Sequence, residues 1–348
     1  MIVLARESRG MSQGDLAHAI GASQGSLSKI EAGLREPGSE TIRDIAKALH
    51  FPESFFSLRD RIYGPSASEF YHRKRSTVPV RVLAQIHANI NMQIMFIERL
   101  LRSAEYPEIR IRQHSVEDFG DSAAEVARVI RAEFQLPKGP IRDLTEVVED
   151  AGAIVVPLDF GTDLVDAVSW WIPRRPPMIF MNASSPADRT RMSMAHELGH
   201  LVMHQEVCPE MENEANRFAA EFLAPADEIK PFLRDATLKT LAAMKPFWKV
   251  SMAFLLKRAQ DVQAISDGAA KYMWIQFSKA GYKKREPAEL DIPREVPTTL
   301  RSLIDAHAED LGYTTENFSE MAHRYADDLA TSNPLPSVTA RGKLRLVR

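Results

Sequence analysis

The sequence has very little cysteine and no long apolar run. Cys208 is the only cysteine among 348 residues, so an internal disulfide and a cysteine-rich zinc ribbon are both excluded. No apolar stretch approaches the roughly 20 residues that cross a bilayer, and the opening MIVLARESRG lacks the apolar core of a signal peptide. We expect a cytoplasmic protein with no membrane association, whose metal sites, if any, use histidine and carboxylate ligands.

An excess of one charge sign is also missing. The 44 Lys and Arg residues nearly balance the 47 Asp and Glu residues, and the formal net charge is -3. Binding of nucleic acid must therefore be argued from a local motif. The 45% of hydrophobic and 26% of charged residues are typical of globular proteins, and the length predicts two or three domains with their own cores.

At the start of the chain, apolar residues recur at helical spacing in five short blocks, residues 2–8, 13–20, 24–32, 40–49 and 53–58. Serines stand at expected N-caps and glycines at expected helix ends: Ser12, Ser23, Ser39, Gly10, Gly21 and Gly33. This pattern predicts a compact five-helix domain over residues 1–62.

Residues 12–33, SQGDLAHAIGASQGSLSKIEAG, contain two short helices separated by a turn, which is how a second helix is presented to the major groove. The segment closely resembles the XRE family of helix-turn-helix domains. The resemblance implies binding to operator DNA, with a phosphate contact at the first helix and base contacts from the second. The residues expected to contact DNA are Gln13, Ser23, Gln24, Ser26, Ser28, Lys29 and Arg35.

The balanced charge of this domain argues against strong DNA binding by a single subunit. Residues 1–61 hold eight basic and eight acidic residues, which predicts modest affinity for each subunit. A homodimer would offset this by placing two half-sites about one helical turn apart. The alternative is that the fold recognises another protein, such as a related repressor.

A Gly/Pro/Ser-rich linker over residues 63–78 follows, with a basic cluster, His72 to Arg75, that is either solvated or in contact with phosphate. Helices are expected at 79–103, 122–135 and 141–150, and apolar runs at 153–157, 167–172 and 178–181 predict a small sheet. Further helices reach residue 263. A mostly helical extension, 264–348, ends in a basic tail that suggests no chemistry of its own: Arg341, Lys343, Arg345 and Arg348.

The strongest chemical motif is AHELGH, residues 195–200. Residues four apart share one face of a helix, so His196 and His200 can ligate one Zn²⁺. Glu197 lies beside them as a general base for water. The preceding run MIFMN is expected to be an edge strand, and the acidic segment after the motif can supply the third protein ligand of a catalytic zinc site.

Four residues are candidates for the third ligand: Glu212, Glu214, His204 and Cys208. His204 lies one turn beyond His200 on the same helix, so it cannot easily complete a tetrahedron, and a structural role is favoured. Cys208 is better explained as an inert small side chain than as a reactive thiol. Glu212 can bind zinc while Asn216, four residues later, hydrogen-bonds a ligating imidazole; Glu214 points away from that face.

The pair RMSMAHELGHLVMH and ENEANRFAAEFLAP resembles the ImmA/IrrE family of zinc metallopeptidases, with a similar layout from about residue 69 to 278. The resemblance implies that zinc is held by His196, His200 and Glu212, and that Glu197 is the general base. It places the family's Ala-Asn and Phe-Ala segment at 215–219. The usual Leu-Leu-Met-Pro ending is changed here to FLAP, residues 222–225, which keeps the proline and leaves the ligands unaffected.

The family's chemistry implies an endopeptidase in which Glu197 takes a proton from water and passes it to the leaving amine. We expect the scissile chain to lie extended beside Ile179 and Met181 by strand addition. The sequence identifies no second donor for the developing oxyanion.

These observations predict a mainly α protein of the α+β class: a helix-turn-helix domain at 1–62, a zincin-like domain with a small sheet at 79–263, and the extension at 264–348. The leading hypothesis is a transcriptional regulator that uses zinc-dependent cleavage of a repressor protein to relieve repression. One alternative is a DNA-binding transcription factor whose zinc domain senses a signal without hydrolysis. Another is the enzymatic half of a mobile-element or toxin-antitoxin-like module.

Overall fold

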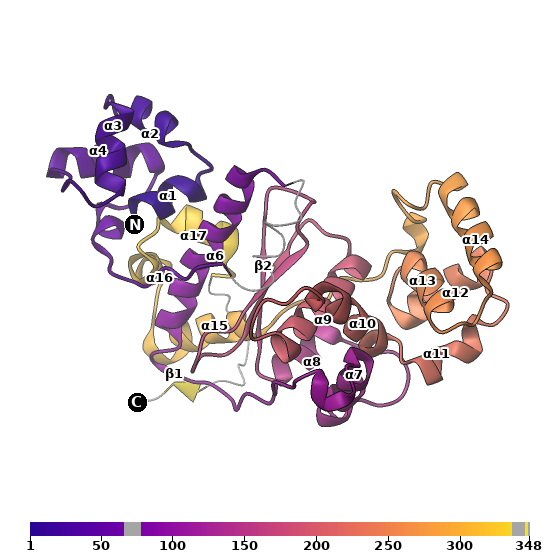
Figure 1. Ribbon diagram of the computed structural model, residues 1–348. Coiled ribbons are helices and arrows are strands. Elements are labelled where there is room, and N and C mark those ends of the chain that lie inside the picture. The colour runs from indigo at the N-terminus through magenta and orange to yellow at the C-terminus, as the bar shows by residue number, and fades with distance from the viewer. Residues whose placement is uncertain (66–77, 336–344, 347–348) are drawn as a thin grey trace.

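A computed structural model describes residues 1–65, 78–335 and 345–346 (Figure 1). The basic cluster at residues 72–75 and the tail residues Arg341, Lys343 and Arg348 lie outside this part of the chain. Within it the protein is mainly helical with one three-stranded sheet, so the predicted fold class is confirmed.

The N-terminal domain contains four α-helices and a final 3-10 helix: α1 (Ile2–Ser8), α2 (Gln13–Ala19), α3 (Gln24–Glu31), α4 (Ser39–Leu49) and η1 (Glu53–Ser57). Ser12 caps α2 in a reciprocal capping box with Asp15, and the Ser23 hydroxyl accepts a hydrogen bond from the Ser26 amide at the start of α3. The third expected N-cap is wrong by one residue. Gly38 holds that position, and Ser39 is the first residue of α4.

Helix α6 (Val80–Leu100) joins the N-terminal domain to the rest of the protein (Figure 1). Ala88, Met92 and Met95 pack into the core of α1–α4, whereas Ile90 and Ile94 pack into the core beside the sheet. The helix is therefore buried on two sides and belongs structurally to both cores. None of the described helices combines the length and apolar character that crossing a bilayer requires.

The three-stranded sheet has the order β2-β4-β3, with β2 (Ile154–Leu158) parallel and β3 (Ala167–Trp170) antiparallel to the central β4 (Met178–Asn182). Its side chains alternate between two cores. Val155, Ile179 and Met181 join the helical core that contains α9, and Val156 and Phe180 join the core that contains α6. The sheet thus forms the middle of three layers.

One outer layer holds the helices that carry the chemical motifs: α7 (Ala123–Glu133), α8 (Leu144–Asp150), α9 (Ala187–Met203) and α10 (Met211–Leu223). Further along, four helices form a lobe on the opposite side of the molecule from α1–α4 (Figure 1): α11 (Ala226–Leu233), α12 (Leu238–Trp248), α13 (Met252–Asp261) and α14 (Asp267–Lys279). Buried side chains of this lobe, such as Trp248 and Phe277, belong to the same core as α7–α10.

The segment predicted as a C-terminal extension, residues 264–348, packs against two different parts of the protein. Its first helix, α14, packs against α13, whereas α15 (Thr299–Leu311) and α16 (Thr315–Ala322) pack against α6. The remaining short elements are α17 (Ala326–Ser332), η2 (Glu117–Phe119), η3 (Ala288–Leu290), and the paired strands β1 (Ala104–Glu105) and β5 (Arg345–Leu346). The chain therefore returns along the sheet layer to the N-terminal domain.

Carboxylates that are buried or partly buried connect this returning segment to distant helices. Glu295 accepts hydrogen bonds from the Leu144 and Thr145 amides at the start of α8, and Glu286 accepts them from the Met252 and Ala253 amides at the start of α13. Glu149 accepts hydrogen bonds from the Thr298 and Thr299 amides at the start of α15. Each carboxylate satisfies amides that have no partner within their own helix.

The N-terminal domain also contacts α17. The Arg9 guanidinium donates to both carboxylate oxygens of Asp328, at 2.9 and 3.0 Å, and to the Leu49 carbonyl at 2.8 Å. The same group lies over the Phe51 ring, 4.6 Å from its centroid. A bidentate pair of this kind fixes orientation as well as proximity, so the domain is held at both α6 and α17.

A buried ion pair inside the N-terminal domain generates a stability prediction. Arg6 and Glu31 pair at 2.6 Å with side chains 10% and 4% exposed, so Glu31→Ala leaves the guanidinium buried without its carboxylate. We expect a loss of about 3 kcal/mol of local stability, measured as faster amide hydrogen exchange across α2–α4 in the full chain. Arg43→Ala is the control, because its pair with Glu53 is 69% and 54% exposed and should contribute less than about 1 kcal/mol. Equal effects of the two variants would contradict the prediction.

Candidate metal centre

Helix α9 places the two histidines and the glutamate of the AHELGH motif. It continues without a break from Ala187 to Met203, so His196 and His200 lie one turn apart on the same face. Their Nε2 atoms are 3.0 Å apart, and the rings meet edge to face with centroids 4.6 Å apart. Two ring nitrogens that face each other this closely form an arrangement suited to sharing one cation.

Helix α10 brings Glu212 to the same point. The Glu212 carboxylate lies 3.2 Å from His200 Nε2 and 3.6 Å from His196 Nε2. Ligand bonds of 2.0–2.1 Å to tetrahedral zinc imply about 3.3 Å between ligand atoms. The three side chains therefore have the spacing that one zinc ion requires, and they form a group able to hold a metal.

The close approach of α9 and α10 depends on Gly199. A Cβ atom at this position would lie 3.0 Å from Phe218 Cδ1 and 3.4 Å from Ala215 Cα. With a larger residue, either the Phe218 ring must shift or α10 must move away from α9, and Glu212 with it. The glycine inside the motif is thus a packing requirement of the site.

Asn216 lies one turn after Glu212 and contacts the first histidine. Its Oδ1 is 3.2 Å from His196 Nδ1, and its Nδ2 donates to the Glu212 carbonyl at 2.7 Å. A proton on His196 Nδ1 is thereby directed to Asn216, which leaves Nε2 with its lone pair for a metal. This is the usual way in which a neighbouring group selects the ligating nitrogen of histidine.

Glu197 satisfies a further test of whether the residues suit a zinc ion. Its side chain is only 2% exposed, and Oε2 is buried without a hydrogen-bond partner in the described part of the chain. A buried carboxylate oxygen left unpaired is costly unless a ligand or water completes it. Together with the His/His/carboxylate donor set, this orphaned oxygen fits a catalytic zinc site with an open position.

The surroundings of His196 and His204 favour the neutral form of each ring. Burial, followed by the neighbouring His200 ring, lowers the pKa of His196. Burial also lowers the pKa of His204, whose Nε2 lies 2.9 Å from Glu214 Oε2. Neutral imidazole is the ligating form of histidine, so the lowered pKa of His196 favours metal binding.

The structure places the three other ligand candidates away from this point but close to one another. His204, Cys208 and Glu214 form a second group beside the first. Burial and the Glu214 carboxylate both raise the pKa of the Cys208 thiol, which argues against a reactive thiolate. The expectation that Glu214 faces away from the His196 and His200 nitrogens agrees with its bond to His204.

The predicted substrate strand is wrong. Residues 178–182 form the central strand β4, which is hydrogen-bonded to β2 on one side and β3 on the other. Ile179 and Met181 are buried in the core that contains α9, so no peptide can be added beside them. The unbroken apolar run MIFMN is typical of a strand covered on both faces, and this pattern does not distinguish a central strand from an edge strand such as β3, which is also buried throughout.

A cavity of about 330 Å³ opens at the metal centre and is lined by Glu197, Glu212 and His196. Its other walls are residues that enter β3 and earlier turns of α9: Leu164, Asp166, Ala167, Arg189, Met192 and Ser193. Sequence reasoning missed Ser193 and Arg189, although they precede Glu197 by four and eight residues and so share its helix face. Arg189 is paired with Asp166 at 2.8 Å, which fixes one side of the cleft.

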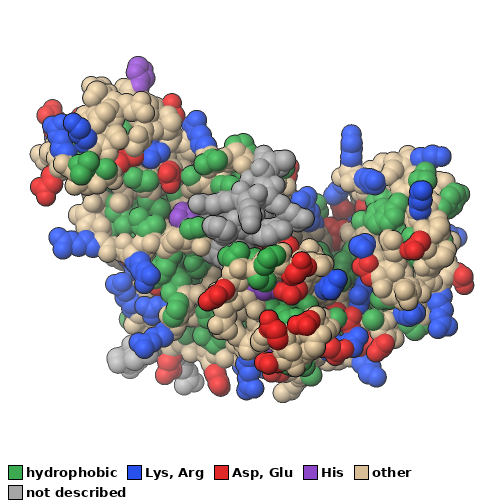
Figure 2. All heavy atoms as spheres, viewed as in Figure 1, with side chains coloured by type: hydrophobic (Ala, Val, Ile, Leu, Met, Phe, Trp, Pro, Cys, Tyr) green, Lys and Arg blue, Asp and Glu red, His purple; other side chains and the backbone are tan. Residues whose placement is uncertain are grey.

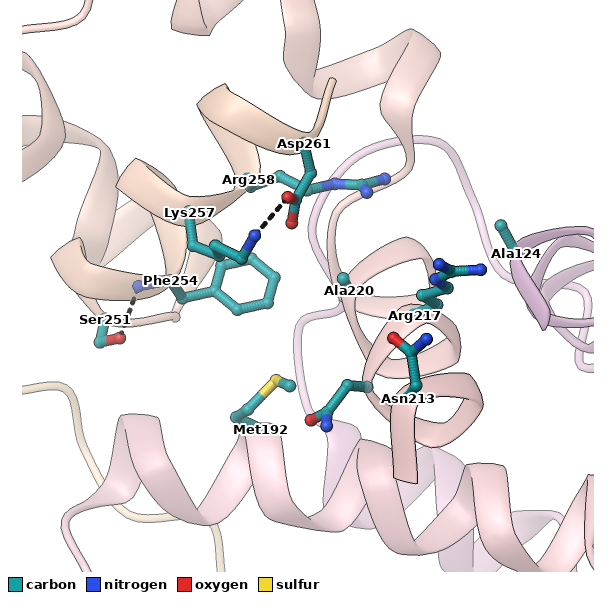
Figure 3. Close-up of a pocket in the computed structure, with 11 residues that line it drawn as sticks. Ala124, Met192, Asn213, Arg217, Ala220, Ser251, Phe254, Lys257, Arg258 and Asp261 are labelled. Carbon is teal, nitrogen blue, oxygen red and sulfur yellow. Dashed lines mark hydrogen bonds and ion pairs between the residues drawn. The ribbon is translucent and has the colours of Figure 1, made fainter. Parts of the chain in front are cut away.

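A larger pocket of about 800 Å³ adjoins this cavity, and Met192 and Asn216 line both. It lies between α10 and the α11–α14 lobe, where the surface in Figure 2 is hollowed. Figure 3 shows Phe254 and Lys257 on one side and Ala220 and Arg217 on the other. The cleft at the metal centre therefore continues into a space that can take several side chains.

In the N-terminal domain, α3 presents the side chains expected to reach DNA. Gln24, Ser28 and Lys29 are exposed, Ser26 is half-buried, and Ser23 caps the helix. The remaining two expected contacts are engaged within the domain: Gln13 donates to Glu31 at 2.7 Å, and Arg35 donates to the Ser26 hydroxyl at 3.2 Å. The exposed face of α3 is thus the surface available for recognition.

Comparison with protein families gives two matches. Residues 2–56 match the helix-turn-helix family model, and residues 148–260 match the model of the IrrE N-terminal-like domain. The chain joins a helix-turn-helix domain to an IrrE N-terminal-like domain. His196, Glu197, His200 and Glu212 all lie in the IrrE N-terminal-like domain, which is metallopeptidase-like. No curated protein matches the chain.

The Gly199 contact generates a prediction for the IrrE N-terminal-like domain. Gly199→Ala should separate α9 from α10 and lower zinc affinity by about tenfold or more, measured by competition with a chelator. Gly268→Ala is the matched control, because Gly268 also lies in a helix and its added methyl group would meet no atom within 4 Å. Unchanged zinc affinity in Gly199→Ala would contradict the packing argument.

Proposed function

We propose that the protein is a transcriptional regulator with zinc-dependent endopeptidase activity, which relieves repression by cleaving a repressor protein. The observation that supports this most directly is the convergence of His196 Nε2, His200 Nε2 and the Glu212 carboxylate beside the buried, unpaired Glu197 Oε2. A structural metal site would not require a buried carboxylate oxygen that is free to accept a proton from water. A hydrolytic site does.

In this proposal His196, His200 and Glu212 hold the zinc ion. When bound, zinc supplies a Lewis acid that polarises the peptide carbonyl and makes water more acidic. Glu197 Oε2 accepts a proton from water in the cleft and returns it to the nitrogen of the leaving amine. Asn216 keeps the His196 ring in position through its hydrogen bond at Nδ1.

The substrate chain would lie in the cleft between the residues entering β3 and helix α9. Ala167 and Asp166 form one wall there, and Ser193 and Met192 form the other. On one side of the scissile bond the chain can continue past Asn216 into the larger pocket, which is lined by Arg217 and Phe254 (Figure 3). A cleft of this length is suited to an internal segment of a polypeptide.

The helix-turn-helix domain would bring the protein to operator DNA. The exposed Gln24 and Lys29 on α3 are the side chains with the chemistry for a base edge and for a phosphate or guanine. Because the domain is held against α6 and by the Arg9–Asp328 pair, the cleavage site would be positioned relative to the DNA. This arrangement favours a repressor bound nearby as the substrate.

Loss of the general base should separate catalysis from folding and metal binding. We expect Glu197→Gln to bind zinc and to slow cleavage at least about a hundredfold, followed by mass spectrometry with the repressor encoded by the neighbouring gene. Glu206→Gln is the control, since Glu206 is exposed and lies outside both cavities. Cleavage by Glu197→Gln at the rate of the unmodified protein would exclude this mechanism.

The DNA-binding part of the proposal has its own test. Lys29→Ala should weaken binding to the promoter region of the protein's own gene and reduce the salt slope by about one, measured by fluorescence anisotropy at several salt concentrations. Lys271→Ala removes the same charge from exposed helix α14, in the opposite lobe. If both variants bind DNA equally well, Lys29 does not contact DNA; if the unmodified protein does not bind DNA either, the helix-turn-helix domain recognises a protein instead.

A further inference from the structure

Three potential metal ligands form a second group next to the proposed zinc site, in contact with His200 through His204. They are His204, at the end of α9, Glu214, in the first turn of α10, and Cys208, in the connection between the two helices. One ligand atom from each lies within 4.8 Å of the other two. No part of the proposed peptidase chemistry uses these side chains.

The distances in this cluster approach those of a metal site. His204 Nε2 is 2.9 Å from Glu214 Oε2, and Cys208 Sγ is 4.0 Å from the same oxygen. Tetrahedral zinc with bonds of 2.0–2.3 Å implies about 3.3 Å between nitrogen and oxygen and about 3.6 Å between sulfur and oxygen. Small side-chain movements therefore suffice to place one ion among the three atoms.

The ligand types suit a thiophilic divalent ion. Thiolate and imidazole together favour zinc and cobalt over magnesium or calcium. The His204 side chain is 3% exposed and that of Glu214 is 22% exposed, so the cluster is sheltered while one side remains open to solvent. Three protein ligands with a solvent position complete the coordination that zinc adopts.

The two groups are connected through their histidines. His200 Nδ1 lies 2.9 Å from His204 Nδ1, and each ring directs its Nε2 toward a different group, His200 toward Glu212 and His204 toward Glu214. One proton lies between the two Nδ1 atoms, and in the neutral pair the second proton lies on His204 Nε2, which faces Glu214. For both Nε2 atoms to ligate an ion, this second proton must move to the Nδ1 of its own ring, and the two Nδ1 atoms, each then carrying a proton, must move apart. An ion in one group therefore weakens binding in the other without excluding it.

We propose that His204, Cys208 and Glu214 form a second transition-metal site, which takes up Zn²⁺ next to the site formed by His196, His200 and Glu212. Binding releases one proton, from the Cys208 thiol, while the His204 Nε2 proton moves to Nδ1 of the same ring and Glu214 supplies its carboxylate. The second ion binds more weakly than the first, because Cys208 must move closer to Glu214 and lose its proton. Through the His200–His204 contact, each ion alters the affinity for the other.

Cobalt distinguishes the two sites, because only the second contains sulfur. The metal-free full chain is titrated with Co²⁺, and the thiolate-to-cobalt charge-transfer absorption is followed together with the number of bound ions per chain. We expect two ions per chain, with the sulfur band growing mainly as the second ion binds. In Cys208→Ser the band disappears and the count falls to one, and in Glu214→Gln the second ion binds at least about tenfold more weakly.

The variant His196→Ala tests whether the second site is independent. It removes a ligand of the first site and leaves all three atoms of the second, so the sulfur band should persist with one ion per chain. Circular dichroism of each variant establishes that it is folded.

Three results would overturn the proposal. A single ion per chain without a sulfur band at saturating Co²⁺ means that the cluster is only a hydrogen-bonded support for His200. A band that grows with the first equivalent, or that is lost in His196→Ala, assigns Cys208 to the first site. Because no step involves peptide cleavage, an inactive peptidase with two bound ions would refute the proposed function and leave this proposal standing.

Discussion

The close packing of α9 against α10 is the constraint on which the rest of the site depends. Helix α9 can hold two histidines on one face, but a third ligand on the same helix cannot enclose an ion. The carboxylate must come from another element, and Glu212 reaches the histidines because Gly199 lets Phe218 and Ala215 approach closely. The absence of a Cβ atom at residue 199 therefore allows the close approach that brings Glu212 to the two histidines.

The same packing organises what surrounds the metal centre. It buries Glu197 with an unpaired oxygen and sets Asn216 against His196. It also brings His204, one turn beyond His200, to Glu214, two residues beyond Glu212. The two ligand groups are thus successive contacts of one helix pair. The Nδ1 atoms of His200 in one group and His204 in the other are in hydrogen-bond contact. A change in the protonation or position of one ring therefore alters the other.

Long-range carboxylate contacts hold the layers around this helix pair. Glu286, Glu295 and Glu149 each accept backbone amides from a helix far away in sequence. Lys245 is buried between Asp188 at the start of α9 and Glu286 in the returning segment. Since an orphaned buried charge is costly, these contacts fix where the C-terminal segment runs, and that segment in turn carries Asp328 to Arg9 of the N-terminal domain.

Helical spacing, capping serines and the paired motifs were enough to predict the helix-turn-helix domain, the helices α9 and α10, and the identity of the residues that gather at the metal centre. These are local patterns, in which side chains three or four residues apart share a face. The expected position of the small sheet is confirmed as well, because runs of apolar residues bounded by turns are also a local feature.

The strand order, the cleft and the second ligand group were decided only by the tertiary structure. An apolar run such as MIFMN does not state which neighbours it pairs with, so the sequence could not show that β4 is central or that the cavity at the metal centre opens beside β3. The distance between His204, Cys208 and Glu214 likewise depends on how two helices cross and how their connection turns back. Such relations are set by packing between elements, and no single segment encodes them.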